Sequence, residues 1–237
     1  MSVKIGHASI GEGGKGRNGQ FGDQTGKEVC IRDWYNNNWN VLLRPAEQYA
    51  NGIAEACEAG CANDNIGYDM NQRNTLHVEA KKVGYDLSKV GPCETDCSEF
   101  ATVCSIAGGI TELEHIGNAP TTRTMKNVFK ATNKFTVITE PKYLTGYQYL
   151  KRGDILLKEG SHTVIVLSDG EKAKDSIPAD LIGKDIRKVT ALNLNARISP
   201  MGSKLFLLHA GDSVNVTGEK DGWCRIEAWV SNQYLVK

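Results

Sequence analysis

Two residues of the sequence, Cys97 and His162, combine the side chains and positions that nucleophilic catalysis requires. Cys97 follows Asp96, a residue type that often begins helices, so its thiol is expected on the first turn of a helix. Unpaired N–H groups and the positive end of the helix dipole favour a thiolate there. His162 opens a predicted strand and supplies an imidazole that can accept the thiol proton. Each residue alone is more often structural, but the pair predicts a cysteine nucleophile with a histidine base.

Local sequence patterns predict the helix that would carry Cys97. Asp96 with Glu99 three positions later resembles a capping box, and apolar residues then follow at helical spacing until Gly108 and Gly109. Two earlier segments also predict helices. One begins at Pro45 and stops at Gly60, and the other runs over residues 75–83.

The histidine lies in a segment that predicts antiparallel strands. Residues 154–157 and 162–167 read as two strands joined by a turn at Glu159 and Gly160, and residues 135–139 form another β-rich run. Side chains alternate between faces along a strand, so His162 shares a face with Val164 and Val166. Helices followed by an antiparallel sheet predict the α+β class.

The composition changes after residue 167. A charged stretch at 171–188 is predicted to be a linker, which leaves 1–170 as one domain. Residues 189–237 contain short alternating runs separated by turn residues, the pattern of a small all-β barrel.

Composition excludes several classes of protein. The 237 residues include 28 basic and 28 acidic side chains, a balance that disfavours nucleic acid as a partner. No apolar run has the length of a membrane helix, and residues 1–26 do not resemble a signal peptide. We therefore expect synthesis in the cytoplasm without a signal peptide and no membrane insertion. The spacings Cys57–Cys61 and Cys93–Cys97 do not match zinc knuckles, so neither a metal nor another cofactor is expected.

A family resemblance strengthens the Cys97–His162 pair. The runs Asp96-Cys97-Ser98-Glu99-Phe100, Arg152-Gly153-Asp154-Ile155 and His162-Thr163-Val164-Ile165-Val166 resemble the core of the NlpC/P60 and CHAP cell-wall cysteine peptidases. The resemblance covers residues 96–168. It implies a papain-like fold, Cys97 as nucleophile, His162 as base, and a thioester intermediate in the hydrolysis of peptidoglycan.

The residue that orients the histidine has no clear counterpart in this resemblance. In these families it lies on the strand after the histidine, but here the chain turns at Asp169-Gly170. The Gly-rich N-terminal stretch offers two candidates. Asp23 is a candidate to orient His162, and Gln24 a candidate to donate a hydrogen bond to an oxyanion, the alternative being a polar surface loop.

The C-terminal segment resembles a bacterial SH3 (SH3b) domain. The motifs, in order, are Leu192-Asn193-Leu194-Asn195-Ala196-Arg197, Gly211-Asp212-Ser213-Val214, Gly222-Trp223-Cys224-Arg225-Ile226, Ala228-Trp229-Val230 and Tyr234-Leu235. The resemblance implies cell-wall binding, with Trp223, Trp229 and Tyr234 as candidate contacts. Alternatively, the two tryptophans fill the barrel core.

Together these features predict a bacteriolytic, phage-type endolysin that acts on peptidoglycan after release from the cell. The cleaved bond is either within the stem peptide or between muramic acid and alanine, and the sequence does not choose between endopeptidase and amidase. The alternative is a non-catalytic wall-binding protein with a degenerate peptidase fold. The oligomeric state, the host and the disulfide state are not readable from the sequence.

Overall fold

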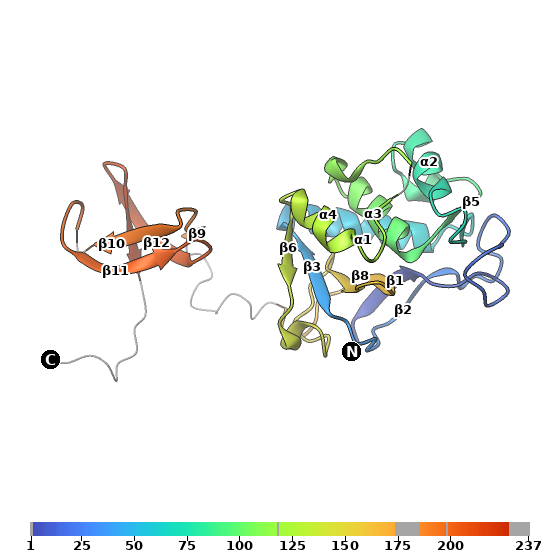
Figure 1. The fold of residues 1–237 in the computed structure, drawn as a ribbon, viewed down its shortest axis with the longest axis horizontal. Helices are drawn as coiled ribbons and strands as arrows, with labels where there is room; N and C mark the ends of the chain where they lie inside the picture. The colour runs from blue at the N-terminus through green and yellow to red at the C-terminus, as the bar shows by residue number, and fades with distance from the viewer. Residues whose placement is uncertain (1, 118, 174–184, 198, 228–237) are drawn as a thin grey trace. The chain divides into compact units, whose positions relative to one another are not determined.

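The computed structural model describes residues 2–117, 119–173, 185–197 and 199–227 (Figure 1). The chain divides into two compact units, Met1–Ser176 and Ile177–Lys237. In the described residues no helix has the length and apolar character needed to cross a membrane.

A six-stranded antiparallel sheet forms the centre of unit 1, with strand order β2-β1-β8-β7-β3-β6. Its strands are β1 (Lys4–Ala8), β2 (Val29–Asp33), β3 (Val41–Pro45), β6 (Phe135–Ile138), β7 (Ile155–Lys158) and β8 (His162–Val166). The N-terminal strand β1 lies between the edge strand β2 and β8, so it is an interior strand of the sheet.

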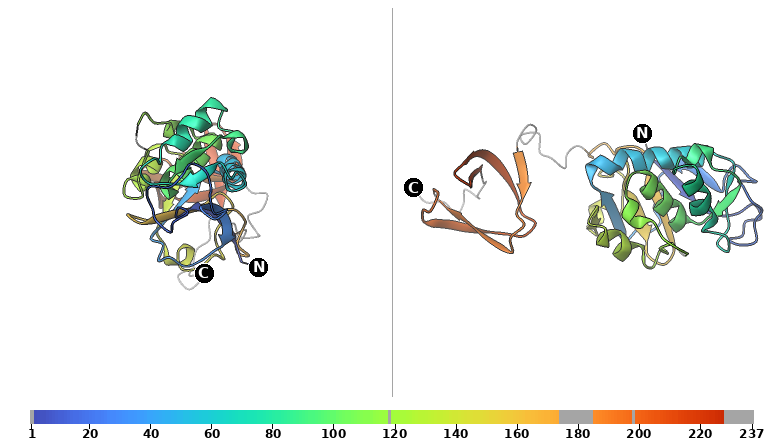
Figure 2. Two further views of the ribbon diagram at one scale, coloured as in Figure 1. Left: turned by 90° about the vertical axis from the view of Figure 1, so that its right-hand side faces the viewer. Right: turned by 90° about the horizontal axis from the view of Figure 1, so that it is seen from above.

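The helices of unit 1 are α1 (Glu47–Cys61), α2 (Thr75–Lys82), α3 (Cys97–Ala107) and α4 (Met125–Ala131). Short 3-10 turns cover Leu87–Lys89, Thr111–Leu113 and Pro141–Tyr143. A small parallel pair, β4 (Ile66–Tyr68) and β5 (Cys93–Thr95), precedes α3. Helices α1 and α3 pack against each other and against the sheet, as Figures 1 and 2 show.

The two faces of the sheet bury separate hydrophobic clusters because side chains alternate along each strand. On β8, Ile165 faces the helices and packs in the larger cluster with Phe100 of α3. Val164 and Val166 face the other way and pack with Trp39 and Leu150. The predicted alternation of the His162 strand is therefore confirmed for its apolar residues.

The third predicted helix and the predicted hairpin are confirmed. The Asp96 side chain caps α3 by accepting a hydrogen bond from the Glu99 N–H at 2.8 Å, and Gly108 ends the helix. Strands β7 and β8 pair antiparallel, with Lys158 opposite His162. The helix predicted at 75–83 is α2, which runs over Thr75–Lys82 with Val83 as its C-cap.

Three expectations for unit 1 need correction. Pro45 belongs to β3, and α1 begins after it at Glu47. Gly60 lies inside α1 and does not end it. A glycine is needed there because a Cβ atom at this position would come within 2.7 Å of the Phe100 ring. The predicted order of helices before sheet is also wrong, because three strands of the sheet precede α1.

Unit 2 consists of short strands among the described residues. They are β9 (Asp185–Lys188), β10 (Asn193–Arg197), β11 (Lys204–His209), β12 (Ser213–Lys220) and β13 (Trp223–Glu227). Strands β10 and β11 form one antiparallel pair, and β12 lies between β13 and β9 in a second sheet. An all-β arrangement agrees with the segment's sequence pattern.

The predicted linker at 171–188 falls largely on residues 174–184, which lie outside the described residues. At its start, the Lys172 N–H donates to the Gln148 carbonyl and Ala173 is buried in unit 1. At its end, Asp185–Lys188 forms β9 rather than linker.

Candidate active site

Cys97 lies where the sequence places it, at the first position of α3. Strand β5 leads into Asp96, whose cap fixes the start of the helix, and the Cys97 side chain is buried. The backbone N–H of Thr163 lies close enough to the Cys97 sulfur to favour its thiolate form, which lowers the pKa of the thiol. Since Thr163 directly follows His162, the thiol lies at the start of β8, although thiol and imidazole do not hydrogen-bond to each other in this structure.

The charge state of Cys97 differs from the expectation of a lowered pKa. Burial, with the neighbouring Asp96 carboxylate, raises the pKa of the Cys97 thiol to about 12. The Thr163 and Ser98 N–H groups and Arg73 act in the opposite direction but do not outweigh burial. The thiol is therefore neutral at neutral pH, and the helix terminus alone does not make a thiolate.

His162 is held by aromatic neighbours on the sheet face that α1 and α3 do not cover. Its ring stacks on Trp39 with 6.2 Å between centroids. On its other side, His162 Nε2 lies 3.2 Å from His7 Nδ1 of β1, and the two rings meet edge to face. These two contacts fix the plane and the direction of the imidazole.

Both imidazoles of this pair are neutral at neutral pH. Burial, and then the positive charge of Arg32, lowers the pKa of His162 to about 4, while Asp96 opposes the shift. Burial also lowers the pKa of His7 to about 3, with contributions from His162 and Arg32. A neutral imidazole has one nitrogen free to accept a proton.

His7 is the site residue that sequence reasoning missed. The sequence patterns around position 7 assign it no role, yet its side chain is 2% exposed, and its Nε2 has no hydrogen-bond partner among the described residues. Strand β1 carries it to β8 through the pairing of Gly6 with Ile165. The alternation from Val3 to Ala8 was the available signal, but only the sheet pairing shows that His7 adjoins His162.

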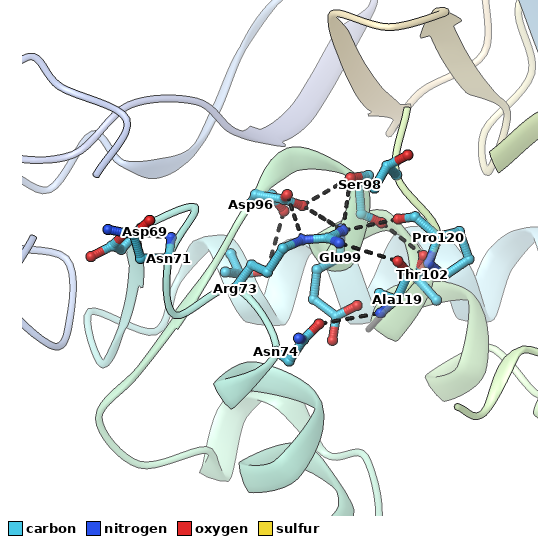
Figure 3. A network of polar contacts seen from close by, with 12 residues as sticks. Asp69, Asn71, Arg73, Asn74, Asp96, Ser98, Glu99, Thr102, Ala119 and Pro120 are labelled. Carbon is cyan, nitrogen blue, oxygen red and sulfur yellow. Dashed lines mark hydrogen bonds and ion pairs between the residues drawn. The ribbon is translucent and has the colours of Figure 1, made fainter. Parts of the chain in front are cut away.

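A buried polar network holds the turn that carries Cys97 (Figure 3). Arg73 Nε lies 2.6 Å from Asp96 Oδ2, and an Arg73 N–H donates to Ser98 Oγ at 3.0 Å. The same guanidinium donates to the carbonyls of Ala119 and Pro120. Arg73 therefore ties the start of α3 to the segment that follows it.

Asp23 and Gln24 organise their own loop. The Asp23 carboxylate accepts hydrogen bonds from the backbone N–H groups of residues 25 and 27–29. The Gln24 amide donates to the carbonyls of Phe21 and Gly22. In the part of the chain that the structure describes, neither side chain hydrogen-bonds to His162 or Cys97.

Of the three candidate wall-binding aromatics, Trp223 is half-buried at the start of β13, whereas Trp229 and Tyr234 lie outside the described residues. The six cysteines of unit 1 are free thiols. No three His, Cys, Asp or Glu side chains among the described residues are arranged to hold a metal ion.

Residues 5–173 match the family model of the endolysin-like domain. The chain belongs to the endolysin-like domain family. The match spans strand β1 with His7, helix α3 with Cys97 and strand β8 with His162. No curated protein and no solved structure matches the chain.

Membership of the endolysin-like family implies a cell-wall lytic function with peptidoglycan as the substrate. The mixed helices and sheets of unit 1 are compatible with such a domain. The family match ends at residue 173 and does not extend to unit 2, Ile177–Lys237.

Proposed function

We propose that unit 1 is a cysteine hydrolase that cleaves an amide bond of peptidoglycan, with Cys97 as nucleophile and His162 as general base. The observation that carries this proposal is the meeting of a buried thiol at the start of α3 with the first residues of β8, inside a domain of an endolysin-like family. His7 is the positioning residue for His162, a role for which the sequence offered Asp23 as a candidate.

The charge states define the first step. Because thiol and imidazole are both neutral, the thiol proton passes to His162 as sulfur attacks the carbonyl carbon, rather than before substrate binds. A rotation of the thiol away from the Thr163 amide brings it to the imidazole, since catalytic hydrogen bonds often tighten only in the substrate complex. The Cys97 N–H has no intrahelical acceptor at this position, so it is the proposed hydrogen-bond donor to the oxyanion.

Collapse of the tetrahedral intermediate completes acylation. The C–N bond breaks, the leaving amine takes the proton from the imidazolium, and a thioester to Cys97 remains. A water molecule then gives a proton to His162 and attacks the thioester, the C–S bond breaks, and the Cys97 sulfur takes the proton back from the imidazolium. The products are a carboxylic acid and the regenerated thiol, so atoms and charges balance without a metal or redox partner.

The contact with His7 is compatible with the tautomer of His162 that this mechanism needs. If the His162 Nε2–H donates to His7 Nδ1, the Nδ1 atom of His162 is left as the free base. The His7 lone pair then also stabilises the imidazolium that forms during each step. A positioning role of this kind requires an acceptor at position 7 but no charge there.

The papain-like subtype, of the NlpC/P60 or CHAP kind, and the SH3 identity of unit 2 are part of the proposal. The motifs around Cys97, Asp154 and His162 support the first, and the five spaced motifs of residues 192–235 support the second. Unit 2 would keep the enzyme on the wall, with the half-buried Trp223 as one contact. The bond is either a stem-peptide bond or the muramoyl-alanine bond.

The test is loss of turbidity of Gram-positive cell walls treated with the full chain and with its Cys97→Ala variant. Mass spectrometry of the released fragments identifies the bond. Cys104→Ala is a matched control, because it removes a second buried thiol from the same helix. We expect the wild type and Cys104→Ala to clear the walls, and Cys97→Ala to bind them without clearing.

Equal clearing of cell walls by the wild type and Cys97→Ala would overturn the assignment of Cys97 as the nucleophile. If neither protein clears any wall of a broad panel while both bind, the chain is a non-catalytic wall-binding protein instead. Deletion of residues 188–237 separates binding from cleavage, because we expect it to weaken wall binding while soluble fragments are still cut.

A further inference from the structure

Arg32 lies beside the histidine pair without belonging to the proposed catalytic set. In the pairing of β1 with β2, Arg32 is opposite Ile5 and Cys30 is opposite His7. Directly opposed residues point to the same face of a sheet, so the exposed Arg32 side chain shares a face with His7. Its position is therefore set by the same strands that carry the site.

Aromatic rings connect Arg32 to the imidazoles. The Arg32 guanidinium carbon lies 4.9 Å from the centre of the Tyr35 ring, and that ring is 6.3 Å from the His7 ring. The half-buried Tyr35 is also close enough to Cys97 for a charge on the thiol to raise the pKa of its hydroxyl group. Tyr35 thus lies between the exposed Arg32 and the imidazole of His7.

The guanidinium has no carboxylate partner among the described residues. Arg44, Arg73 and Arg152 of the same unit each form an ion pair with an acidic side chain. The guanidinium lies over the Tyr35 ring, and its N–H groups make no hydrogen bond or ion pair among the described residues, so they are available to a ligand. Those edges match the two oxygens of a carboxylate.

The charge of Arg32 works against the reaction when no anion is bound. It lowers the pKa of His162, so it disfavours the imidazolium that must form as the thiol attacks. A carboxylate bound at Arg32 would offset this positive charge and make His162 a better base. Substrate binding and proton transfer would then be coupled through one residue.

We propose that Arg32 is a specificity-determining residue that binds a free carboxylate of the substrate next to the scissile bond. This inference rests on the proposed hydrolysis of peptidoglycan and names one feature of its substrate. A γ-linked glutamate in a stem peptide leaves its α-carboxyl group free, or carries an amide there. The structure assigns the free acid as the preferred form.

Binding to the inactive Cys97→Ala chain tests this preference apart from turnover. Two synthetic stem peptides are compared by calorimetry, identical except that the glutamate α-carboxyl group is free in one and amidated in the other. We expect Arg32→Gln, added to Cys97→Ala, to weaken binding of the free acid by about 10- to 100-fold, the effect of losing a charged hydrogen-bonded pair. Binding of the amide should change by less than about threefold.

Two further variants control for charge and geometry. Lys130→Gln removes one positive charge from the exposed surface of α4 and should leave both affinities unchanged. Arg32→Lys keeps the charge but loses the paired N–H edges, and should bind the free acid with intermediate affinity. In the active enzyme, the KM for the free acid should rise with Arg32→Gln more than the KM for the amide.

Equal weakening of both peptides by Arg32→Gln, or no weakening of either, would overturn the role of Arg32. A shift of the pH profile that is the same for both peptides would show that Arg32 acts only on His162. If Cys97→Ala binds neither peptide, the assignment to a free carboxylate fails. The hydrolase proposal is judged separately, by whether the wild type clears cell walls.

Discussion

Unit 1 contains two pairs of neighbouring histidines whose surroundings shift their pKa values differently. His7 and His162 meet with 5.4 Å between ring centres, and burial lowers the pKa of both. His77 and His115 stack at 4.1 Å, but His115 also lies 3.5 Å from the buried Glu99 carboxylate, which raises its pKa. The neighbouring carboxylate, rather than the histidine pair itself, decides which site holds a proton.

The difference explains why only one pair suits proton transfer from a thiol. A neutral His162 can accept a proton at neutral pH, whereas an imidazole paired with Glu99 already tends to hold one. Both pairs adjoin the first turn of α3. Cys97 contacts the start of β8, while Glu99, two residues later on the helix, faces His115.

The largest expected effect separates the two pairs by function. His162→Gln should lower the rate of wall clearing by about 10²- to 10⁴-fold, because it removes the general base. His115→Gln is the matched change in the other pair and should lower the rate by less than about threefold, the size expected where no group touches substrate. Turbidity loss measured at equal protein concentration checks both values.

Comparable losses of wall-clearing rate in His162→Gln and His115→Gln would contradict the functional difference between the two histidine pairs. Thermal melts of both proteins show whether a loss reflects unfolding, since a folded His115→Gln chain without activity would give the second pair a role in the reaction.

A smaller effect is expected at His7, which acts through His162. His7→Ala should lower kcat by about 10- to 100-fold, a typical cost of removing the partner that orients a functional imidazole. His7→Asn restores a side-chain oxygen that can accept the His162 N–H and should recover part of the rate. A merely structural role would show in the melting temperature of both variants and would not predict this rescue.

The smallest expected effect is a pH dependence of stability at the second pair. Because Glu99 raises the pKa of His115 above its usual 6.5, the pair contributes stability below that pH and loses it as pH rises through the folded-state pKa. Burial raises the pKa of Glu99, which acts in the same direction. The positive charge of Arg73 opposes the rise in the pKa of His115. The pKa of the neighbouring His77 is lowered by burial, by His115 and by Lys81, while Glu114 acts in the opposite direction.

His115→Gln should therefore flatten the fall in the free energy of unfolding above pH 6.5, because it removes the group whose pKa Glu99 raises. Urea unfolding at pH 6 and pH 8 measures the change. If the free energy of unfolding falls equally in the wild type and His115→Gln, the ion pair does not contribute to this pH dependence. His162→Gln is the control, and it should show the same fall as the wild type.

The local parts of the site could be predicted from sequence. The cap at Asp96 and the hairpin at His162 are set by neighbouring residues, and the structure confirms both. His7 could not be found in this way, because its contact with His162 joins positions 155 residues apart through the pairing of β1 with β8. Its single strand is short and contains Gly6, so it gave a weak β signal.

The raised pKa of the Cys97 thiol could not be predicted from the neighbouring residues in the sequence either. The helix start predicts a lowered pKa, but burial beneath the rest of the domain raises it, and burial is a property of the whole fold. Asp23 illustrates the same limit, since its hydrogen bonds within residues 25–29 are visible only once the loop is folded.

The most direct test of the central claim is to trap the acyl-enzyme. The wild type is mixed with a soluble muropeptide, quenched in acid within milliseconds to seconds, and digested for mass spectrometry. The account predicts that the peptide containing Cys97 gains the mass of the acyl fragment, with no such gain in Cys97→Ala or on Cys104. Release of product at the wild-type rate by Cys97→Ala, with no adduct on Cys97 in the wild type, would contradict it.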